Sequence, residues 1–77
     1  MDKYKRQELA RARQRGADML VKVERFLNRH DMEATTFGVL ATNDSKLVFD
    51  MRKGDRVLRR KTLAKIRAFM LVHALAA

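Results

Sequence analysis

Apolar side chains recur at intervals of three and four residues along most of this chain, which is the spacing of one face of an amphipathic α-helix. Between residues 3 and 30 there is no proline, and Gly16 is the only glycine. We therefore predict one long helix over residues 3–30 and expect any bend or fraying at Gly16, because glycine weakens a helix interior. The apolar stripe of this helix consists of Leu20, Val23 and Leu27, with Met19 and Phe26 beside it.

Two short helical segments joined by a turn are predicted in the middle of the chain. Phe37, Leu40 and Ala41 fall on one face of the first segment. Thr42 and Asn43 are the predicted turn, because asparagine tolerates the left-handed backbone conformation that a sharp connection between helices needs.

The second short segment begins at a capping residue and stops at a glycine. Asp44 or Asn43 has the side chain of a good helix N-cap, and Gly54 stands in the usual stop position. Residues 55–60 are then a predicted loop, and a last helix runs from about Lys61 to the C-terminus. The expected inner faces of these two helices are Leu47, Val48 and Met51 in the first, and Leu63, Ile66, Phe69 and Met70 in the second.

The composition favours an all-α fold. The 77 residues include no proline and three glycines, and they are rich in good helix formers. We expect one small domain, residues 1–77, because a chain of this length buries only roughly 60% of its surface and gains from a partner subunit. The chain has no cysteine, so neither disulfides nor cysteine-bound metal can stabilise it.

A net charge of +9 suits a polyanionic partner, with nucleic acid the first choice and an anionic membrane the second. Residues 1–15 carry six basic residues on a segment with few apolar groups. We predict that this basic N-terminal arm projects from the domain. It can be a solvated tail, a DNA-contacting arm or an oligomerisation arm.

The C-terminal helix end, residues 71–77, is apolar apart from His73. A helix that is apolar on every side must be buried on every side, which a monomer of this size cannot achieve. We therefore predict a homodimer through the C-terminal helix, the N-terminal helix or both. The apolar run is too short to cross a bilayer. The ending Leu75-Ala76-Ala77 also resembles the C-terminal tags that bacterial energy-dependent proteases recognise.

Several short motifs between residues 32 and 70 follow one another in a recognisable order. An apolar residue and a small one stand early in the first short helix, Phe37-Gly38, with Ala41 one turn later. An apolar pair three residues apart follows in the second helix, Val48 and Met51. The later motifs are the ending Arg52-Lys53-Gly54, a basic loop, and a helix with Thr62-Leu63, Ile66 and Met70.

In this order the motifs resemble the helix-turn-helix of the phage Cro and repressor family of bacterial transcription regulators. Thr42 stands where that family has a turn glycine, and Asn43 where it has an apolar residue. Leu47 and Phe49 are apolar where the family often has polar groups. These departures leave the register open by one residue.

The resemblance implies that the second helix of residues 32–70 enters a DNA major groove. Ser45 and Lys46 then suit base edges. Asp50 is expected to orient a neighbouring arginine, with acceptance of a hydrogen bond from a cytosine amine as the alternative. Phe49 is either a core residue, the favoured interpretation, or a contact to a thymine methyl group. Arg52 and Lys53 lie near the end of the helix. In the loop that follows, the predicted phosphate contacts are Arg56, Arg59, Arg60 and Lys61, with a merely solubilising loop as the alternative.

We expect a prokaryotic or phage-type transcriptional regulator, a repressor or an activator, that binds double-stranded DNA as a homodimer without a cofactor or small-molecule effector. The alternatives are a weakly specific nucleoid-associated protein, a protein-interaction adaptor or antitoxin, and a membrane-surface amphipathic protein. An enzyme is not expected, because the carboxylates are scattered singly and His30 and His73 have no partners in the sequence. The N-terminus lacks the apolar segment of a signal peptide, so a cytoplasmic, nucleoid location is expected.

Overall fold

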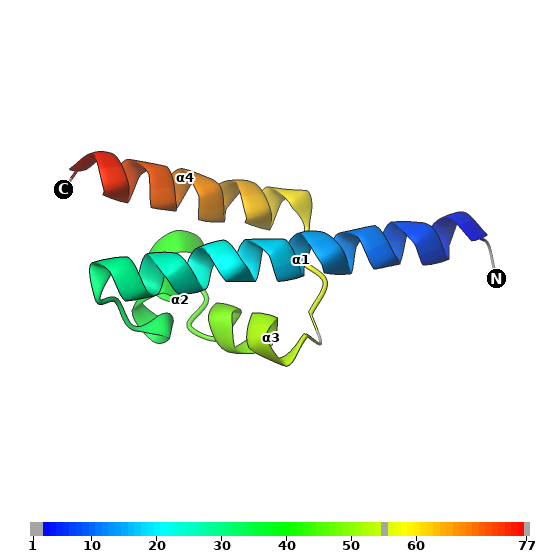
Figure 1. Cartoon of the computed structure of the whole chain (residues 1–77), viewed down its shortest axis with the longest axis horizontal. Helices are drawn as coiled ribbons and strands as arrows, with labels where there is room; N and C mark the ends of the chain where they lie inside the picture. The colour runs from blue at the N-terminus through cyan, green and yellow to red at the C-terminus, as the bar shows by residue number, and fades with distance from the viewer. Residues whose placement is uncertain (1–2, 55, 77) are drawn as a thin grey trace.

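Four helices make up the structure. The computed structural model describes residues 3–54 and 56–76, and within them no strand occurs. The all-α prediction is therefore confirmed. Residues 1–2, Asp55 and Ala77, which belong to the predicted arm, loop and helix end, lie outside the described residues. The helices are α1 (Lys3–His30), α2 (Ala34–Thr42), α3 (Leu47–Lys53) and α4 (Arg60–Ala76) (Figure 1).

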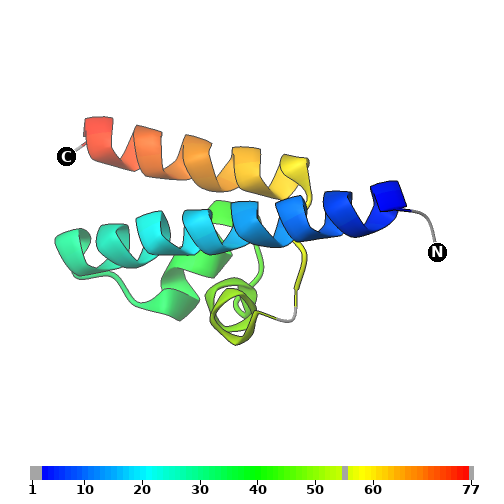
Figure 2. The ribbon, with the colours of Figure 1, turned by 45° about the vertical axis from the view of Figure 1, so that its right-hand side comes forward.

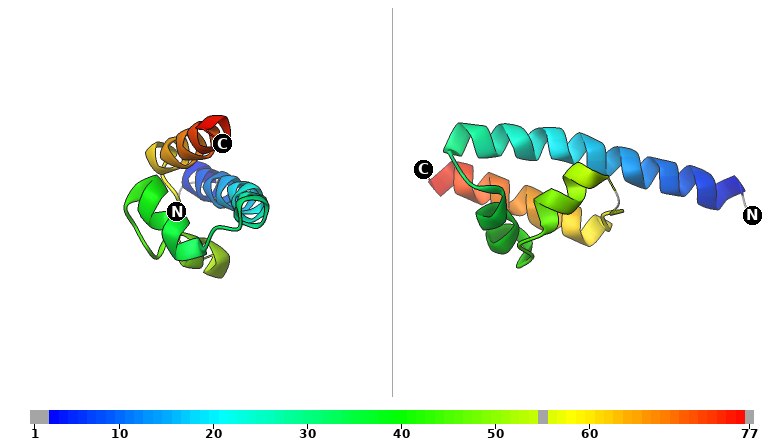
Figure 3. Two further views of the ribbon diagram at one scale, coloured as in Figure 1. Left: turned by 90° about the vertical axis from the view of Figure 1, so that its left-hand side faces the viewer. Right: turned by 90° about the horizontal axis from the view of Figure 1, so that it is seen from below.

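The long helix α1 organises the arrangement. α4 runs along one side of α1 and α3 lies on the other side, as Figures 1 and 2 show. Seen end-on, α2 closes the fourth side of the bundle, between α3 and α4 (Figure 3). α1 continues through Gly16 without a break, and its N-terminal part extends past the other helices (Figure 1).

One hydrophobic core receives side chains from every helix. Phe37 of α2 is fully buried at its centre. Its ring centroid lies 5.6 Å from that of Phe26 on α1 and 5.3 Å from that of Phe69 on α4, within the range of favourable aromatic pairs. The buried core consists of Met19, Val23, Phe26, Leu27, Phe37, Leu47, Val48, Met51, Leu58, Leu63 and Ile66.

The predicted inner face of α2 is wrong at Leu40. Phe37 and Gly38 are buried and Ala41 is half-buried, whereas Leu40 is 61% exposed. Gly38 is buried on the side of α2 that faces the turn before α3, so the buried arc of α2 is centred nearer to Gly38. Leu40 then lies roughly 110° from the middle of that arc, since successive helical residues are about 100° apart.

Gly38 allows α2 to approach the following turn very closely. A Cβ atom at Gly38 would overlap the backbone carbonyl of Asp44, and it would stand 3.4 Å from Leu47 Cβ. The Gly38 carbonyl oxygen accepts hydrogen bonds from the Asp44 N–H and the Thr42 hydroxyl, both at 3.1 Å. The tight approach thus gives the Gly38 carbonyl two donors near the end of α2.

The two positions expected to leave α2 and α3 in a left-handed conformation both do so. Asn43 has φ 59° and ends α2. Gly54 has φ 74° and ends α3, with its N–H bonded to the carbonyls of Asp50 and Met51. Both turn predictions are confirmed, because they rest on which residues tolerate a positive φ.

Candidate nucleic-acid interface

The inner face of α3 anchors this short helix in the core. Leu47, Val48 and Met51 are buried, as the apolar spacing predicted. The interpretation of Phe49 as a core residue is wrong, because its side chain is 43% exposed. Phe49 points roughly 150° away from the middle of the arc formed by the three buried residues, so the helix cannot bury all four.

The outer surface of α3 and of the turn before it is mixed in character. Ser45, Lys46 and Lys53 are exposed beside Phe49. The Arg52 guanidinium lies 5.7 Å from the centroid of the Phe49 ring, within the range of a cation–π contact. This contact restrains an aromatic side chain that would otherwise stand free in solvent.

Asp44 holds the turn that leads into α3. Its Oδ1 accepts a hydrogen bond from the Lys46 N–H at 3.0 Å, and its carbonyl accepts one from the Leu47 N–H at 3.2 Å. Regular helix begins at Leu47, with Lys46 in the cap position. Asp44 therefore caps the turn at residues 45–46 and not α3 itself. The N-cap position of α3 is Lys46, two residues after Asp44.

Arg56 ties the loop after α3 back to the beginning of that helix. Its Nη1 donates to Asp44 Oδ2 at 2.6 Å and lies 3.5 Å from Asp50 Oδ2. The hydrogen bond from Arg56, followed by that from the Lys46 N–H, lowers the pKa of Asp44, and the same pair raises the pKa of Arg56. Asp50 thus lies beside an arginine, as expected. Arg56, a predicted phosphate contact, pairs with two carboxylates of the protein itself.

Asp44→Asn should be less stable to heat than the wild type at pH 7, and this gap should narrow in acid. Asparagine still accepts the Lys46 N–H, so the change removes the charge and the Oδ2 acceptor that pair with Arg56. Since the pKa of Asp44 in the folded protein lies below its ordinary 3.8, the pair stabilises the protein above that pH. The contribution disappears as pH falls through the lowered pKa. Thermal melts from pH 7 to pH 2 test this, and a constant gap would contradict it.

Arg52 connects α3 to α1. Its Nη2 and Nε donate to Glu24 Oε1 at 2.7 and 3.2 Å. Both side chains are partly exposed, so the pair adds orientation more than stability. Together with the Arg56 pairs, it holds α3 at two points outside the core.

Sequence reasoning did not single out Arg13 for this region. A hollow of about 260 Å³ between α1 and α3 is lined by Arg13, Gly16, Arg52 and Arg56, among others. Arg13 is exposed, and it adds a positive charge from α1 beside α3. The signal was present in the sequence only as one arginine among several in the basic arm.

The predicted phosphate contacts at the start of α4 lie elsewhere. Arg59, Arg60 and Lys61 are exposed, but Arg60 lines a separate hollow with Arg11 and Arg15 of α1. The structure therefore divides the ten predicted site residues. Those around α3 are Ser45, Lys46, Phe49, Asp50, Arg52, Lys53 and Arg56. Arg60 lines the other hollow, and Arg59 and Lys61 are exposed at the start of α4 without lining either hollow.

His30 and His73, which looked isolated in the sequence, meet in the fold. Their ring centroids are 4.9 Å apart, and both pack against Phe26 at 4.4 and 5.4 Å. They are half-buried aromatic partners that join the end of α1 to α4. Among the described residues, no three His, Cys, Asp or Glu side chains gather in a way that could hold a metal ion.

Comparisons of the chain with protein-family models, with curated proteins and with solved structures found no match. None of the described helices combines the length and the apolar character needed to cross a membrane.

Proposed function

We propose that this protein is a homodimeric transcriptional regulator that binds double-stranded DNA through the outer surface of α3. The observation that carries the proposal is the way α3 is held. Its inner face is buried, Arg52 bonds to Glu24 of α1, and Arg56 clamps the loop behind it. A helix that reads base edges must be held in position, and here a helix fixed by its buried face and by these ion pairs presents an exposed face to solvent.

The exposed side chains of α3 and of the turn before it suit the edges of base pairs. Lys46 can donate to guanine O6 or N7, and Ser45 can bond to several bases. Phe49 fits an apolar contact with a thymine methyl group, the alternative that its exposure now favours. Lys53 at the end of the helix and Arg13 beside it suit phosphates. In this assignment Asp50 and Arg56 position the helix and do not read DNA.

The apolar surface of α4 supports the homodimer. Leu71, Val72 and Leu75 are all exposed on α4, at the spacing of a helical stripe directed away from the core. Beside this stripe lies a groove of about 550 Å³ between α2 and α4, lined by Leu40, Val72 and six other residues. Lys65 is the only charged side chain lining it, so two copies with a charge of +9 can meet there with little repulsion.

The position of this groove suits a DNA-binding dimer. α1 contributes nothing to its lining, and in the end-on view α2 lies on the left side, away from α1, with α4 along the top and α3 at the bottom (Figure 3). A two-fold axis running from top to bottom along that side would leave both copies of α3 at the bottom. Such a dimer can present both α3 helices to one duplex, with half-sites roughly 34 Å apart.

Lys46→Ala and Lys53→Ala should weaken DNA binding in different ways. Lys46→Ala should lose about 1–3 kcal/mol on the preferred sequence and little on random DNA, because it removes a base contact. Lys53→Ala should weaken both and reduce the salt dependence by about one charge, because it removes a phosphate contact. The preferred sequence would come from selection in a random duplex library, and affinities from fluorescence anisotropy at several salt concentrations.

Lys22→Ala is the matched control, since it removes one exposed charge from α1, away from α3. Equal losses for all three variants on every duplex would contradict base reading by α3. A library that yields no preferred sequence would replace the regulator with a nucleoid-associated protein of low specificity.

A further inference from the structure

A second basic site lies on the side of α1 opposite α3. A hollow of about 260 Å³ is lined by Gln7, Glu8, Arg11, Arg15 and Arg60, and we call it the α1–α4 hollow. Arg11 and Arg15 stand one helical turn apart on the same face of α1, and Arg60 begins α4. Three arginines thus converge from two helices, with Glu8 as the only acid among the lining residues.

The arginines of the α1–α4 hollow are available for a ligand. The ion pairs among the described side chains are those of Arg52 with Glu24 and of Arg56 with Asp44 and Asp50, so Glu8 neutralises none of the three arginines at bonding distance. Arg15 Nε is buried and has no hydrogen-bond acceptor. An anion in the hollow could supply that acceptor after a small movement of the guanidinium, which is already half-buried and so loses less freedom on binding.

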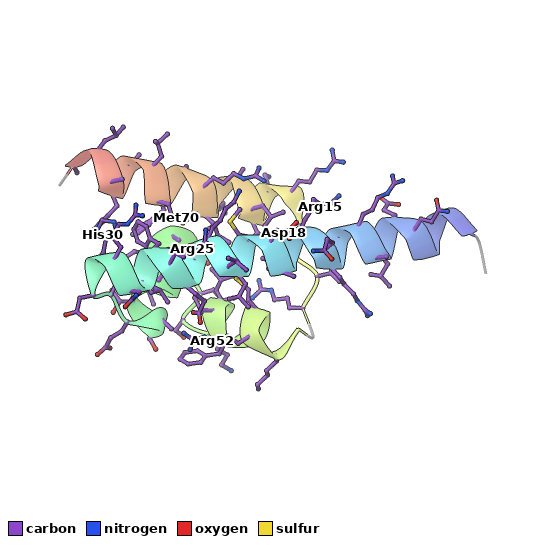
Figure 4. The ribbon with its side chains drawn as sticks, in the orientation of Figure 1. Arg15, Asp18, Arg25, His30, Arg52 and Met70 are labelled. Carbon is purple, nitrogen blue, oxygen red and sulfur yellow. The ribbon has the colours of Figure 1, made fainter. Side chains whose placement is uncertain are left out.

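The α1–α4 hollow and α3 face opposite ways. Figure 4 shows Arg15 on the side of α1 that meets α4, and Arg52 on the opposite side, at α3. Arg13 turns toward α3, because residues two apart on a helix point about 160° away from each other. A straight duplex against the outer surface of α3 therefore lies on the side of α1 that faces away from Arg11 and Arg15.

We propose that the α1–α4 hollow binds a backbone phosphate of a second segment of DNA, so that one protein molecule bridges two duplexes. The assignment of the first duplex rests on the function proposed for α3. The chemistry of the hollow favours phosphate, because guanidinium groups bind phosphate oxygens through several directed N–H donors. Such a site carries no sequence information, so the second duplex can have any sequence.

The first test measures the hollow by itself. In spectra of ¹⁵N-labelled full-length protein, the Arg15 Nε–H signal is assigned by its absence in Arg15→Lys. Titration with inorganic phosphate should shift this signal in the wild type and leave it in place in Arg11→Ala/Arg60→Ala. This readout does not depend on α3, so it still reports on the hollow if the function proposed for α3 fails. No shift in the wild type would overturn the proposal.

The second test measures bridging. Wild-type protein on a bead-tethered duplex should capture a labelled duplex of unrelated sequence. Arg11→Ala/Arg15→Ala/Arg60→Ala should reduce this capture at least tenfold, with a change in single-duplex affinity no larger than that of the control. The control, Lys22→Ala/Arg25→Ala/Arg29→Ala, removes the same charge from exposed positions of α1 that line a different hollow, beside Leu71 of α4, and should still capture.

Each other result counts against bridging through the hollow. Capture that survives the triple arginine variant but is lost in Leu75→Asp would assign bridging to the dimer. A shift of Arg15 with phosphate or a free nucleotide, without capture of a second duplex, would make the hollow a site for small phosphate ligands. If the control lost capture equally, the loss would come from the lower net charge and not from the α1–α4 hollow.

Discussion

Gly38→Ala should lower the melting temperature of this protein substantially, and Gly38→Leu should prevent its folding. The added Cβ would overlap the carbonyl group of Asp44, which is backbone and cannot swing aside. Overpacking of this kind costs about 1–3 kcal/mol. In a domain of this size each kcal/mol lowers the melting temperature by about 4–8 °C. Circular dichroism melts of both variants measure the effect.

Gly16→Ala is the matched control, because no atom lies within 4 Å of the Cβ position at Gly16. It should stabilise the protein by about 0.5–1 kcal/mol, the gain expected when alanine replaces glycine inside a helix. If Gly38→Ala melted at or above the wild-type temperature, the close approach of α2 to the turn before α3 would be wrong. The position of α3, on which the proposed function depends, would then also be wrong.

Leu75→Asp should convert a dimer into a folded monomer and reduce operator affinity by orders of magnitude. Leu75 is 77% exposed in the single chain, so the substitution costs the monomer little. In the proposed dimer the carboxylate would be buried without a partner, at a cost of several kcal/mol. The affinity falls because a monomer binds only one half-site. Sedimentation and anisotropy on the selected operator measure the two effects.

Val21→Asp controls for the loss of an exposed apolar side chain, since Val21 is exposed on α1 and lies outside the exposed stripe of α4 to which Leu75 belongs. It should leave both the dimer and operator affinity unchanged. A wild-type protein that sediments as a monomer at tens of micromolar would refute the dimer. A Leu75→Asp protein that remains dimeric would move the interface to another surface, with the N-terminal helix as the next candidate.

The features that the sequence predicted well depend on near neighbours along the chain. The stripe of α1, the inner face of α3 and the stops at Asn43 and Gly54 all agree with the structure. Each follows from helical spacing or from the φ angles that a residue type tolerates. Gly38 entered the sequence analysis only as the small residue of the pattern that resembles a helix-turn-helix, and its close approach to Asp44 comes from the structure.

The errors occur where a short helix touches more than one neighbour. Leu40 and Phe49 were both expected in the core, yet both are exposed. In helices of nine and seven residues, one or two contacts decide which arc is buried. At α2, the close contact of Gly38 with Asp44 decides which side of the helix is buried. At α3, the burial of the adjacent residues Leu47 and Val48 decides it.

By itself, the sequence determined that this protein is built of helices, where they end, and that its surface is strongly basic, because these properties follow from local spacing and from charge. Only the tertiary structure decided how that charge is divided. It directs Arg13 toward α3 and gathers Arg11, Arg15 and Arg60 on the opposite side of α1. It also brings Arg56 back to Asp44 and pairs His30 with His73. The physical reason is that contacts between residues distant in sequence depend on how whole helices pack, and a helical pattern specifies which face is buried but not which helix will cover it.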